Sequence, residues 1–223
     1  VAPNELWHHD ACEKCTGKYL HGCVDGATRK IIYMELSMNK SALTVLKCFR
    51  DAVVLYGCPM HVRGDHGTEN VLVHDFICMA RGIPSDGSLG PYITGRSVHN
   101  QRIERLWLDV RRRGFQSYRD LLRHLKDEKI LDLDNELHMW LVQYLLDDRL
   151  HLMIEQFVGM WNNHSLSTEN YSTPNQLYYV KRAQLKCANA PFLEEALKWA
   201  AVQLGEVQDD ENVNPNPPIG SGL

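Results

Sequence analysis

The sequence has no apolar run long enough to cross a membrane. Its longest apolar stretches, such as Trp140–Leu146, fall far short of the roughly 20 residues that a membrane-spanning helix needs. The chain begins with Val1, and no charged start followed by an apolar run is present, so we expect an excised piece of a longer protein. A membrane role is therefore not expected.

A dense cysteine framework is also missing. The chain has 7 cysteines, an odd number, and they are scattered at Cys12, Cys15, Cys23, Cys48, Cys58, Cys78 and Cys187. This pattern is typical of reduced thiols in the cytosol or nucleus. The sequence therefore predicts an intracellular protein, nuclear or cytoplasmic, and excludes a small secreted domain stapled by disulfides.

An overall excess of basic residues is absent as well. There are 24 Lys and Arg against 28 Asp and Glu, which gives a formal net charge of -4. The charge is nevertheless uneven, because the final segment, 193–223, is strongly acidic. In contrast, the segment Arg96–Arg113 holds six arginines against Glu104 and Asp109. We expect an anionic partner to bind there.

The spacing of apolar and turn residues predicts a mixed α/β sheet domain in the first half of the chain. In order, it predicts strands at Leu6–Ala11, Tyr19–Val24 and Ile31–Leu36, a helix at Leu43–Tyr56 capped by Asn39 or Ser41, a strand at Met60–Arg63, a helix at 69–81, a loop at 83–95 and a helix at Val98–Arg112.

Beyond Gly114 the pattern becomes helical. Helices are predicted at about 117–128, 134–162, 174–184 and 191–204, and a capping box of Thr173 and Gln176 opens one of them, with Pro174 at its first position. Trp140, Leu141, Tyr144 and Leu145 are expected to form a helix-packing core. We therefore divide the chain into a core at 1–114, a helical extension packed on it at 115–205, and a disordered acidic, Pro- and Gly-rich tail at 206–223.

Three acidic residues stand where strand and helix geometry could bring them together. Asp10 lies within the first strand, Asp65 directly after the fourth, and Glu104 on the helix that follows the loop. Carboxylate oxygens are the ligands that hard divalent cations prefer, and two such ions about 4 Å apart can promote phosphodiester chemistry. Any one of these acids alone would be interpreted as an ordinary surface residue. The sequence around each acid is therefore needed to decide whether it is a metal ligand.

The sequence around each acid resembles the catalytic core of retroviral and retrotransposon integrases. NELWHHD resembles the family's Trp-x-x-Asp strand, and YLHGCVDGATRKIIY resembles its next two strands. YGCPMHVRGDHGTEN resembles the segment in which Gly-x-Pro, a strand and Asp-x-Gly follow one another, and SVHNQRIERLW resembles the start of the catalytic helix. Downstream, WNNHSLSTENYSTPNQLY is similar to the end of transposase cores. The resemblance covers residues 4–180 and is greatest to integrase-core proteins of eukaryotic genomes that derive from mobile elements.

This resemblance implies a ribonuclease-H-like fold, with a mixed five-stranded sheet flanked by helices and a C-terminal helical extension. It implies that Asp10, Asp65 and Glu104 are catalytic and hold two Mg²⁺ or Mn²⁺ ions. The implied reaction is cleavage at the ends of an element, followed by in-line attack of the freed 3′-hydroxyl on target DNA. DNA is the implied partner, and a homo-oligomer is compatible with it.

Several residues around Glu104 are candidates for phosphate contacts. Arg102 and Arg105 flank it, and Arg96, Asn100 and Arg111 lie nearby in sequence. A solvated basic helix face is the alternative interpretation. The chain also departs from the family pattern, since 38 residues separate Asp65 from Glu104 and Gln101 replaces a glycine. A further departure is Cys12 and Cys15 directly after Asp10.

Two other functions remain open at this point. One is a domesticated descendant that binds DNA or proteins without catalysis, and the other is a ribonuclease-H-like nuclease that cuts strands without joining them. The placement of the three carboxylates separates an enzyme from a binding module, because carboxylates within reach of shared metal ions favour catalysis.

Overall fold

A mixed five-stranded sheet forms the centre of the molecule, as predicted. The computed structural model describes residues 2–15, 18–83, 90–95, 100–183 and 190–207. Strands β1 (Leu6–Cys15), β2 (Lys18–Asp25) and β3 (Ile31–Ser37) form an antiparallel meander, whereas β4 (His61–Gly64) and β5 (Tyr92–Thr94) continue the sheet in parallel. The order across the sheet is β3-β2-β1-β4-β5.

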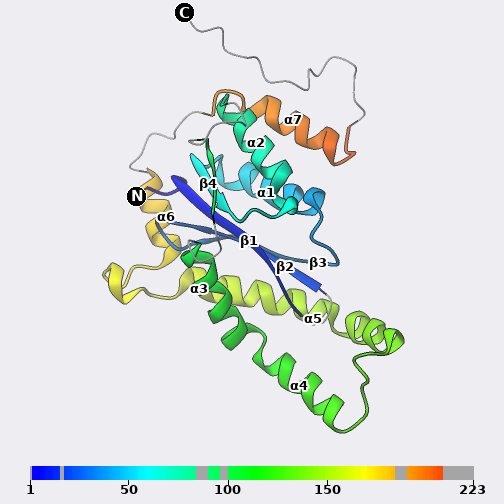
Figure 1. Ribbon diagram of the computed structural model, residues 1–223. Helices are drawn as coiled ribbons and strands as arrows, with labels where there is room; N and C mark the ends of the chain where they lie inside the picture. The colour runs from blue at the N-terminus through cyan, green and yellow to red at the C-terminus, as the bar shows by residue number, and fades with distance from the viewer. Residues whose placement is uncertain (1, 16–17, 84–89, 96–99, 184–189, 208–223) are drawn as a thin grey trace, which may run out of the picture.

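One face of the sheet is covered by α1 (Ala42–Tyr56), α2 (Val71–Arg81) and α7 (Leu193–Gln203) (Figure 1). A short 3-10 turn, η1 (Thr68–Asn70), leads into α2. Trp7 of β1 and Phe76 of α2 both contact the Phe49 ring edge-on, and all three side chains are fully buried. These contacts form the first of two hydrophobic cores.

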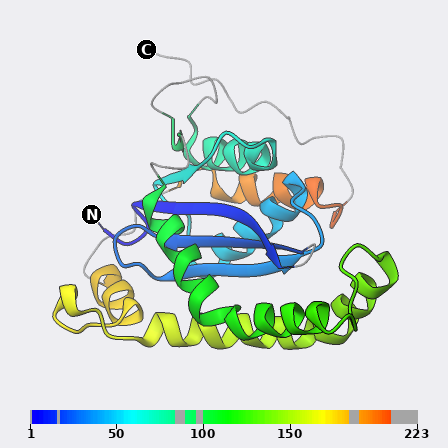
Figure 2. The same cartoon turned by 60° about the horizontal axis from the view of Figure 1, so that its bottom comes forward.

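The opposite face is covered by α3 (Gln101–Asp109) and the long α5 (Glu136–Asn163), and α4 (Gln116–Asp127) shares the second hydrophobic core with α5. A π-helical turn, η3 (Val110–Gly114), joins α3 to α4. Figure 2 shows α3 crossing the strands while α5 runs along them. The second core gathers Trp107 and Ile103 of α3 with residues of β2, β3 and α5. The chain continues through η4 (Ser167–Glu169) to α6 (Pro174–Ala183).

Side-chain caps explain where two of the helices begin. Ser41 caps α1, because its hydroxyl accepts a hydrogen bond from the backbone N–H of Thr44 at 3.2 Å. At α6, the Gln176 N–H donates to the Thr173 hydroxyl at 3.1 Å and the Thr173 N–H donates to the Gln176 side chain at 2.9 Å. The predicted capping box is therefore confirmed.

Two segments differ from the expectation. β1 runs on to Cys15 rather than ending at Ala11, because its antiparallel pairing with β2 continues to Lys18. The segment 83–95 was predicted as a loop throughout, but Tyr92–Thr94 pairs with β4 as the fifth strand. A three-residue strand is too short to show the alternation by which strands are recognised in sequence.

The expectation that Trp140, Leu141, Tyr144 and Leu145 form a packing core is wrong. These side chains are 56%, 40%, 71% and 67% exposed, and the Trp140 and Tyr144 rings stack on each other at 5.4 Å. The 28 residues of α5 span roughly 42 Å, whereas the 7 residues of β3 span roughly 23 Å. The first half of α5 therefore extends past the sheet, and there α4 covers only one side of it (Figure 2).

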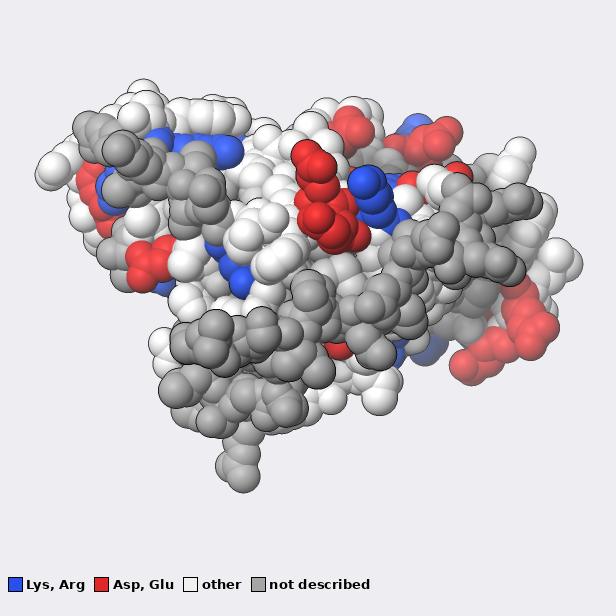
Figure 3. Space-filling view, turned by 90° about the horizontal axis from the view of Figure 1, so that it is seen from above, with Lys and Arg blue, Asp and Glu red and all other residues white. Residues whose placement is uncertain are grey.

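Charged side chains on the side of α2 and α7 occur in small groups of both signs, as far as the described residues show (Figure 3). In the same described part of the chain, no helix combines the length and apolar character that crossing a membrane requires.

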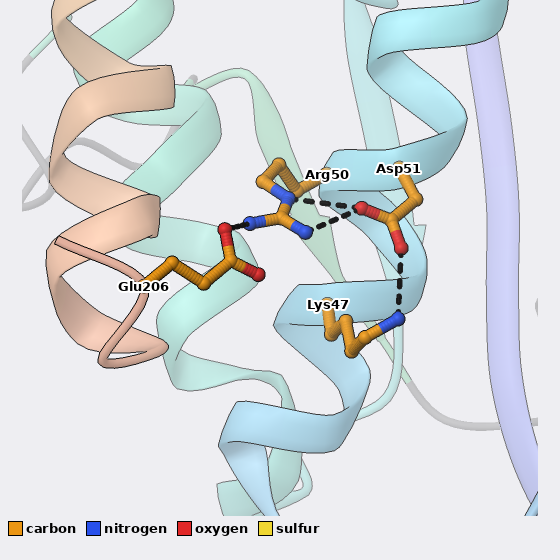
Figure 4. Close-up of polar contacts among 4 residues, drawn as sticks. All are labelled: Lys47, Arg50, Asp51 and Glu206. Atoms are coloured by element: carbon orange, nitrogen blue, oxygen red, sulfur yellow. Dashed lines mark hydrogen bonds and ion pairs between the residues drawn. The ribbon is translucent and has the colours of Figure 1, made fainter.

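An ion-pair network joins the end of α7 to α1. Arg50 contacts both Asp51 and Glu206, and Lys47 donates to Asp51 at 3.0 Å (Figure 4). Glu206 opens the segment that was predicted to be a disordered tail, and this residue is tied to α1. The rest of that prediction, from residue 208 onward, lies outside the described residues.

Candidate functional site

The parallel pairing of β1 with β4 brings Asp10 and Asp65 to neighbouring positions. Leu6 pairs with His61, Trp7 with Val62 and His8 with Arg63, and the same register continued by two residues sets Asp10 beside Asp65. Neighbouring strands lie about 4.8 Å apart. Since side chains alternate along a strand, the Asp10 carboxylate points to the face that α3 covers, whereas His9 points to the face of Phe49. Asp65 directly follows the last residue of β4.

Hydrogen bonds fix the direction of the Asp65 carboxylate. Its Oδ1 accepts from the backbone N–H of Gly67 at 3.0 Å and from the amide of Asn70 at 2.7 Å. Asn70 is buried at the start of α2, so the helix that follows β4 holds the carboxylate in place. No pattern in the sequence indicated this role of Asn70.

Glu104 is placed by a buried asparagine at the start of its helix. Asn100 hydrogen-bonds His8 Nδ1 through its Oδ1 at 2.6 Å, and its amide donates to the carbonyl oxygen of His9 at 3.2 Å. These bonds tie the N-terminus of α3 to β1, and Glu104 lies in the first turn of that helix. Asn100 was predicted to contact DNA. It is only 5% exposed, and its polar groups are directed at β1, so positioning α3 is the role that its contacts support.

Trp107 lies directly beside Asp10. Its indole N–H donates to Asp10 Oδ2 at 2.8 Å. The ring has room there because Gly22, the residue opposite Asp10 in β2, has no side chain: a Cβ on Gly22 would come within 2.6 Å of the ring. A hydrogen bond to a strand 97 positions away leaves no local pattern in the sequence, so this role of Trp107 was not predicted.

Burial raises the pKa of Asp10 to about 6. The hydrogen bond from Trp107 opposes this shift, while the nearby charges of Asp65 and Glu104 add to it. A carboxyl whose neighbours are also carboxylates holds its proton more tightly, because two like charges in a poorly solvated place repel. The three predicted site acids therefore interact electrostatically.

Replacing Trp107 with Phe is expected to raise the pKa of Asp10 further, because the hydrogen bond that stabilises its carboxylate is lost. The titration of the Asp10 carboxyl carbon, followed by NMR, would measure the change. Trp199→Phe is a suitable control, since Trp199 packs in the first core on the other face. An Asp10 pKa that is equal in wild type and Trp107→Phe would contradict this account of the site.

Carboxylate oxygens are suitable ligands for a hard divalent cation, but the three acids are not gathered around one point. Among the described residues, no group of three His, Cys, Asp or Glu side chains lies close enough to hold a metal ion. Carboxylates repel one another without a cation between them, and here Asp10 and Asp65 are each held by other hydrogen bonds. The candidate site therefore has carboxylates of the kind that a divalent cation binds, but among the described residues they do not form a complete set of metal ligands.

A second pair of side chains lies behind Asp65, on the other face of the sheet. His9 Nε2 and the Tyr92 hydroxyl are hydrogen-bonded at 2.7 Å, and Gly64, which precedes Asp65, lies against both groups. Burial lowers the pKa of His9 to about 4, so its ring is neutral at physiological pH. This bond links β1 to β5 across β4, directly beneath the strand end that carries Asp65.

The predicted DNA-contact arginines lie along α3 and η3. Arg102 and Arg105 are exposed, and Arg105 pairs with Asp109 at 3.4 Å. Arg111 Nε donates to the carbonyl oxygen of Trp107 at 3.4 Å. Arg96 lies outside the described residues. Basic side chains therefore flank the acids on the face of α3, whereas the face in Figure 3 carries mixed charges.

Comparison with solved structures shows similarity to retroviral integrases. The HTLV-2 integrase catalytic core domain in complex with magnesium aligns with a TM-score of 0.51 in its trimeric form and 0.50 in its dimeric form. In both, the identity is 18%, and the alignment covers 80% of this chain and 98% of that chain.

A larger assembly is also similar in fold. A chain of the simian T-cell lymphotropic virus intasome in complex with the PP2A regulatory subunit B56 gamma aligns with a TM-score of 0.55 at 16% identity. The alignment covers 86% of this chain and 60% of that chain. At these identities the likeness concerns the fold, and no curated protein matches this chain.

The sheet order, the helices on its two faces and the similarity to these cores confirm the predicted ribonuclease-H-like fold. The family model described as "Integrase core domain" matches residues 1–191, and it contains all three site acids. The chain therefore belongs to the integrase core domain family.

Proposed function

We propose that this chain is a DNA integrase or transposase catalytic domain that cleaves and joins phosphodiesters with two Mg²⁺ or Mn²⁺ ions. The observation that carries the proposal is the placement of Asp10, Asp65 and Glu104. They come from β1, the end of β4 and α3, and the charges of Asp65 and Glu104 add to the rise in the pKa of Asp10 that burial causes. A carboxyl group whose pKa is raised by burial and by neighbouring charges is common at functional sites.

The three acids would be the metal ligands, and the ions would supply charge stabilisation at the reacting phosphate and a more nucleophilic hydroxyl. The rest of the site orients these ligands. Trp107 holds one Asp10 oxygen, Asn70 holds one Asp65 oxygen, and Asn100 ties the helix of Glu104 to β1. Arg102, Arg105 and Arg111 would bind phosphates of the DNA strands.

The proposed substrates are the DNA ends of a mobile element and a target DNA, acted on in the nucleus. A homo-oligomer fits this proposal, since the structures of the similar HTLV-2 core include dimeric and trimeric forms. The cleavage of one strand and the joining of another place several DNA segments near the acids, and positioning them is the main task of the protein.

Metal binding is expected to depend on Asp65 and on pH. Calorimetry with Mg²⁺ or Mn²⁺ should show binding to the wild type and strongly reduced binding to Asp65→Asn, with Asp120→Asn, on the exposed surface of α4, as the control. Below a pH of about 6, Asp10 holds a proton that the ion must displace, so the affinity should fall about tenfold between pH 7 and pH 5. Equal affinity in wild type and Asp65→Asn would remove this metal site.

A DNA- or protein-binding module without catalysis is the second candidate. The observation that favours it is the lack of a closed three-ligand group among the described residues. A strand-transfer and nicking assay with Mn²⁺ on a pre-cut substrate separates the candidates. Joined product supports the integrase, cut but unjoined product supports a plain nuclease, and DNA binding without product supports the binding module.

A further inference from the structure

A cavity of about 630 Å³ is lined by residues of β1, β4 and α3, the elements that carry or lead to the three acids. Five arginines line it: Arg29, Arg63, Arg102, Arg105 and Arg113. They come from the β2–β3 turn, from β4, and from α3 with η3, so separate parts of the chain converge there. We call this cavity the arginine cleft.

The arginine cleft adjoins the candidate site through both strands. His8 and Arg63 line the cleft, and each stands two residues before a site acid on the same strand face. Two residues along a strand correspond to roughly 7 Å. On α3, Arg102 and Arg105 also line the cleft, and they flank Glu104 in sequence. A strand whose phosphate lies at the acids could therefore continue into the cleft.

The charges of the cleft favour an anion. Among the described residues that line the cleft, Asp109 is the single carboxylate, and it already pairs with Arg105 at 3.4 Å. Arg29 approaches Glu169 only at 3.9 Å. Arginines that converge on one cavity repel one another, and a bound phosphate would relieve that repulsion. Guanidinium groups also match phosphate oxygens in geometry.

Aromatic rings complete the cleft. Trp161 and His164, at the C-terminal end of α5, have ring centroids 5.0 Å apart and both line the cavity. The Trp161 indole donates to the carbonyl oxygen of Arg29 at 2.8 Å, which fixes the ring against the β2–β3 turn. Aromatic rings among arginines are the combination on which single-stranded nucleic acids bind, with phosphates on the cations and bases stacked on the rings.

We propose that the arginine cleft holds an unpaired flank of the DNA on which the acids act. Its volume lies in the range of roughly 300–1,000 Å³ that is typical of small-molecule sites, so it has room for individual nucleotides and not for a double helix. The phosphates of the flank contact the arginines, and a base stacks on Trp161 and His164. This inference rests on the proposed function, because it takes DNA as the substrate of the neighbouring acids.

The test compares blunt DNA duplexes with duplexes that carry a short unpaired extension, by fluorescence anisotropy without catalytic metal. Arg113→Ala is the test variant, and Arg112→Ala is the matched control, since Arg112 is the exposed neighbour that does not line the cleft. We expect wild type and Arg112→Ala to bind the extended duplex about tenfold more tightly than the blunt one. Arg113→Ala should lose most of this preference. Equal preference in the two variants, or none in the wild type, would overturn the proposal.

A second arm of the experiment tests the stacking surface. Replacing the bases of the extension with abasic sites keeps the phosphates, and it should weaken wild-type binding by about fivefold or more. His164→Ala should show a much smaller difference between the normal and abasic extensions. If abasic and normal extensions bind the wild type equally, a base does not stack in the cleft and the proposal fails.

The strand-transfer assay, run on wild type and Glu104→Gln, distinguishes a failure of this proposal from a failure of the proposed function. In the strand-transfer assay, product that depends on Glu104 supports the integrase, whatever the cleft binds. If that product is seen but the preference for an unpaired extension is missing, the cleft proposal alone is overturned. If the preference is present and Glu104 does not matter, the catalytic proposal alone is overturned.

Discussion

Glu104→Gln is expected to abolish metal-dependent strand joining while the fold and the DNA affinity remain. Gln has the size and most of the hydrogen-bonding capacity of Glu but carries no charge, so it is a poor ligand for a hard cation. Removal of one preorganised electrostatic contact at a reacting group lowers the rate about 10²- to 10³-fold. The loss of stability should be small, because Glu104 is exposed and an acid in the first turn of a helix contributes only about 0.3–1 kcal/mol.

The measurement is product formation with Mn²⁺ on a pre-cut DNA substrate, beside thermal unfolding and DNA binding of the same samples. Glu136→Gln is the matched control, since Glu136 is also an exposed acid in the first turn of a helix, at the start of α5. The control should keep its activity. Should Glu104→Gln form as much product as the wild type, Glu104 is not a catalytic ligand and the binding module becomes the better account.

Gly64→Ala is expected to destabilise the protein by about 2–4 kcal/mol. A Cβ at this position would collide with the Tyr92 hydroxyl and would come within 2.7 Å of His9 Nε2. The hydrogen bond between these two groups would break, and two buried polar atoms would lose their partners. Urea unfolding of wild type and variant gives the difference. Gly159→Ala is the control, because a Cβ there meets nothing within 4 Å.

A double-mutant cycle identifies the cause of that loss. Tyr92→Phe removes the hydroxyl that the new Cβ would strike, and alone it should cost about 1–2 kcal/mol because His9 loses its partner. In the Tyr92→Phe background, Gly64→Ala should therefore cost less than it does in the wild type. Strictly additive effects would contradict a direct contact between these positions.

The sequence predicted the elements whose patterns are local. Amphipathic spacing located α1 and α4 to within a few residues, and the capping box located the start of α6. The strand β5 was not predicted. Its three residues are too few to show the alternation of a strand, and their pairing with β4 depends on the tertiary structure.

For the candidate site, the sequence indicated the acids but not the groups that contact them. Asp10, Asp65 and Glu104 stand in recognisable strings, whereas the groups that orient them do not. Trp107 matches an apolar helix face, and nothing in its surroundings shows that its indole reaches Asp10. Asn100 matches a polar residue at a helix start, which suggested a DNA contact, but the packing of α3 on β1 turned its amide inward. Such roles depend on contacts between segments distant in sequence.

The order of the sheet has a consequence for folding. The meander β1-β2-β3 forms through contacts between consecutive segments, so its two hairpins can close early at small entropic cost. Asp10 is already on a paired strand at that stage. Asp65 joins it only after the chain has crossed through α1 to lay β4 parallel to β1, and Glu104 only when α3 crosses the sheet. We therefore expect the meander to form on the ribosome before the segments that carry the three acids come together, and the metal binding proposed above should be among the last properties that the nascent protein acquires.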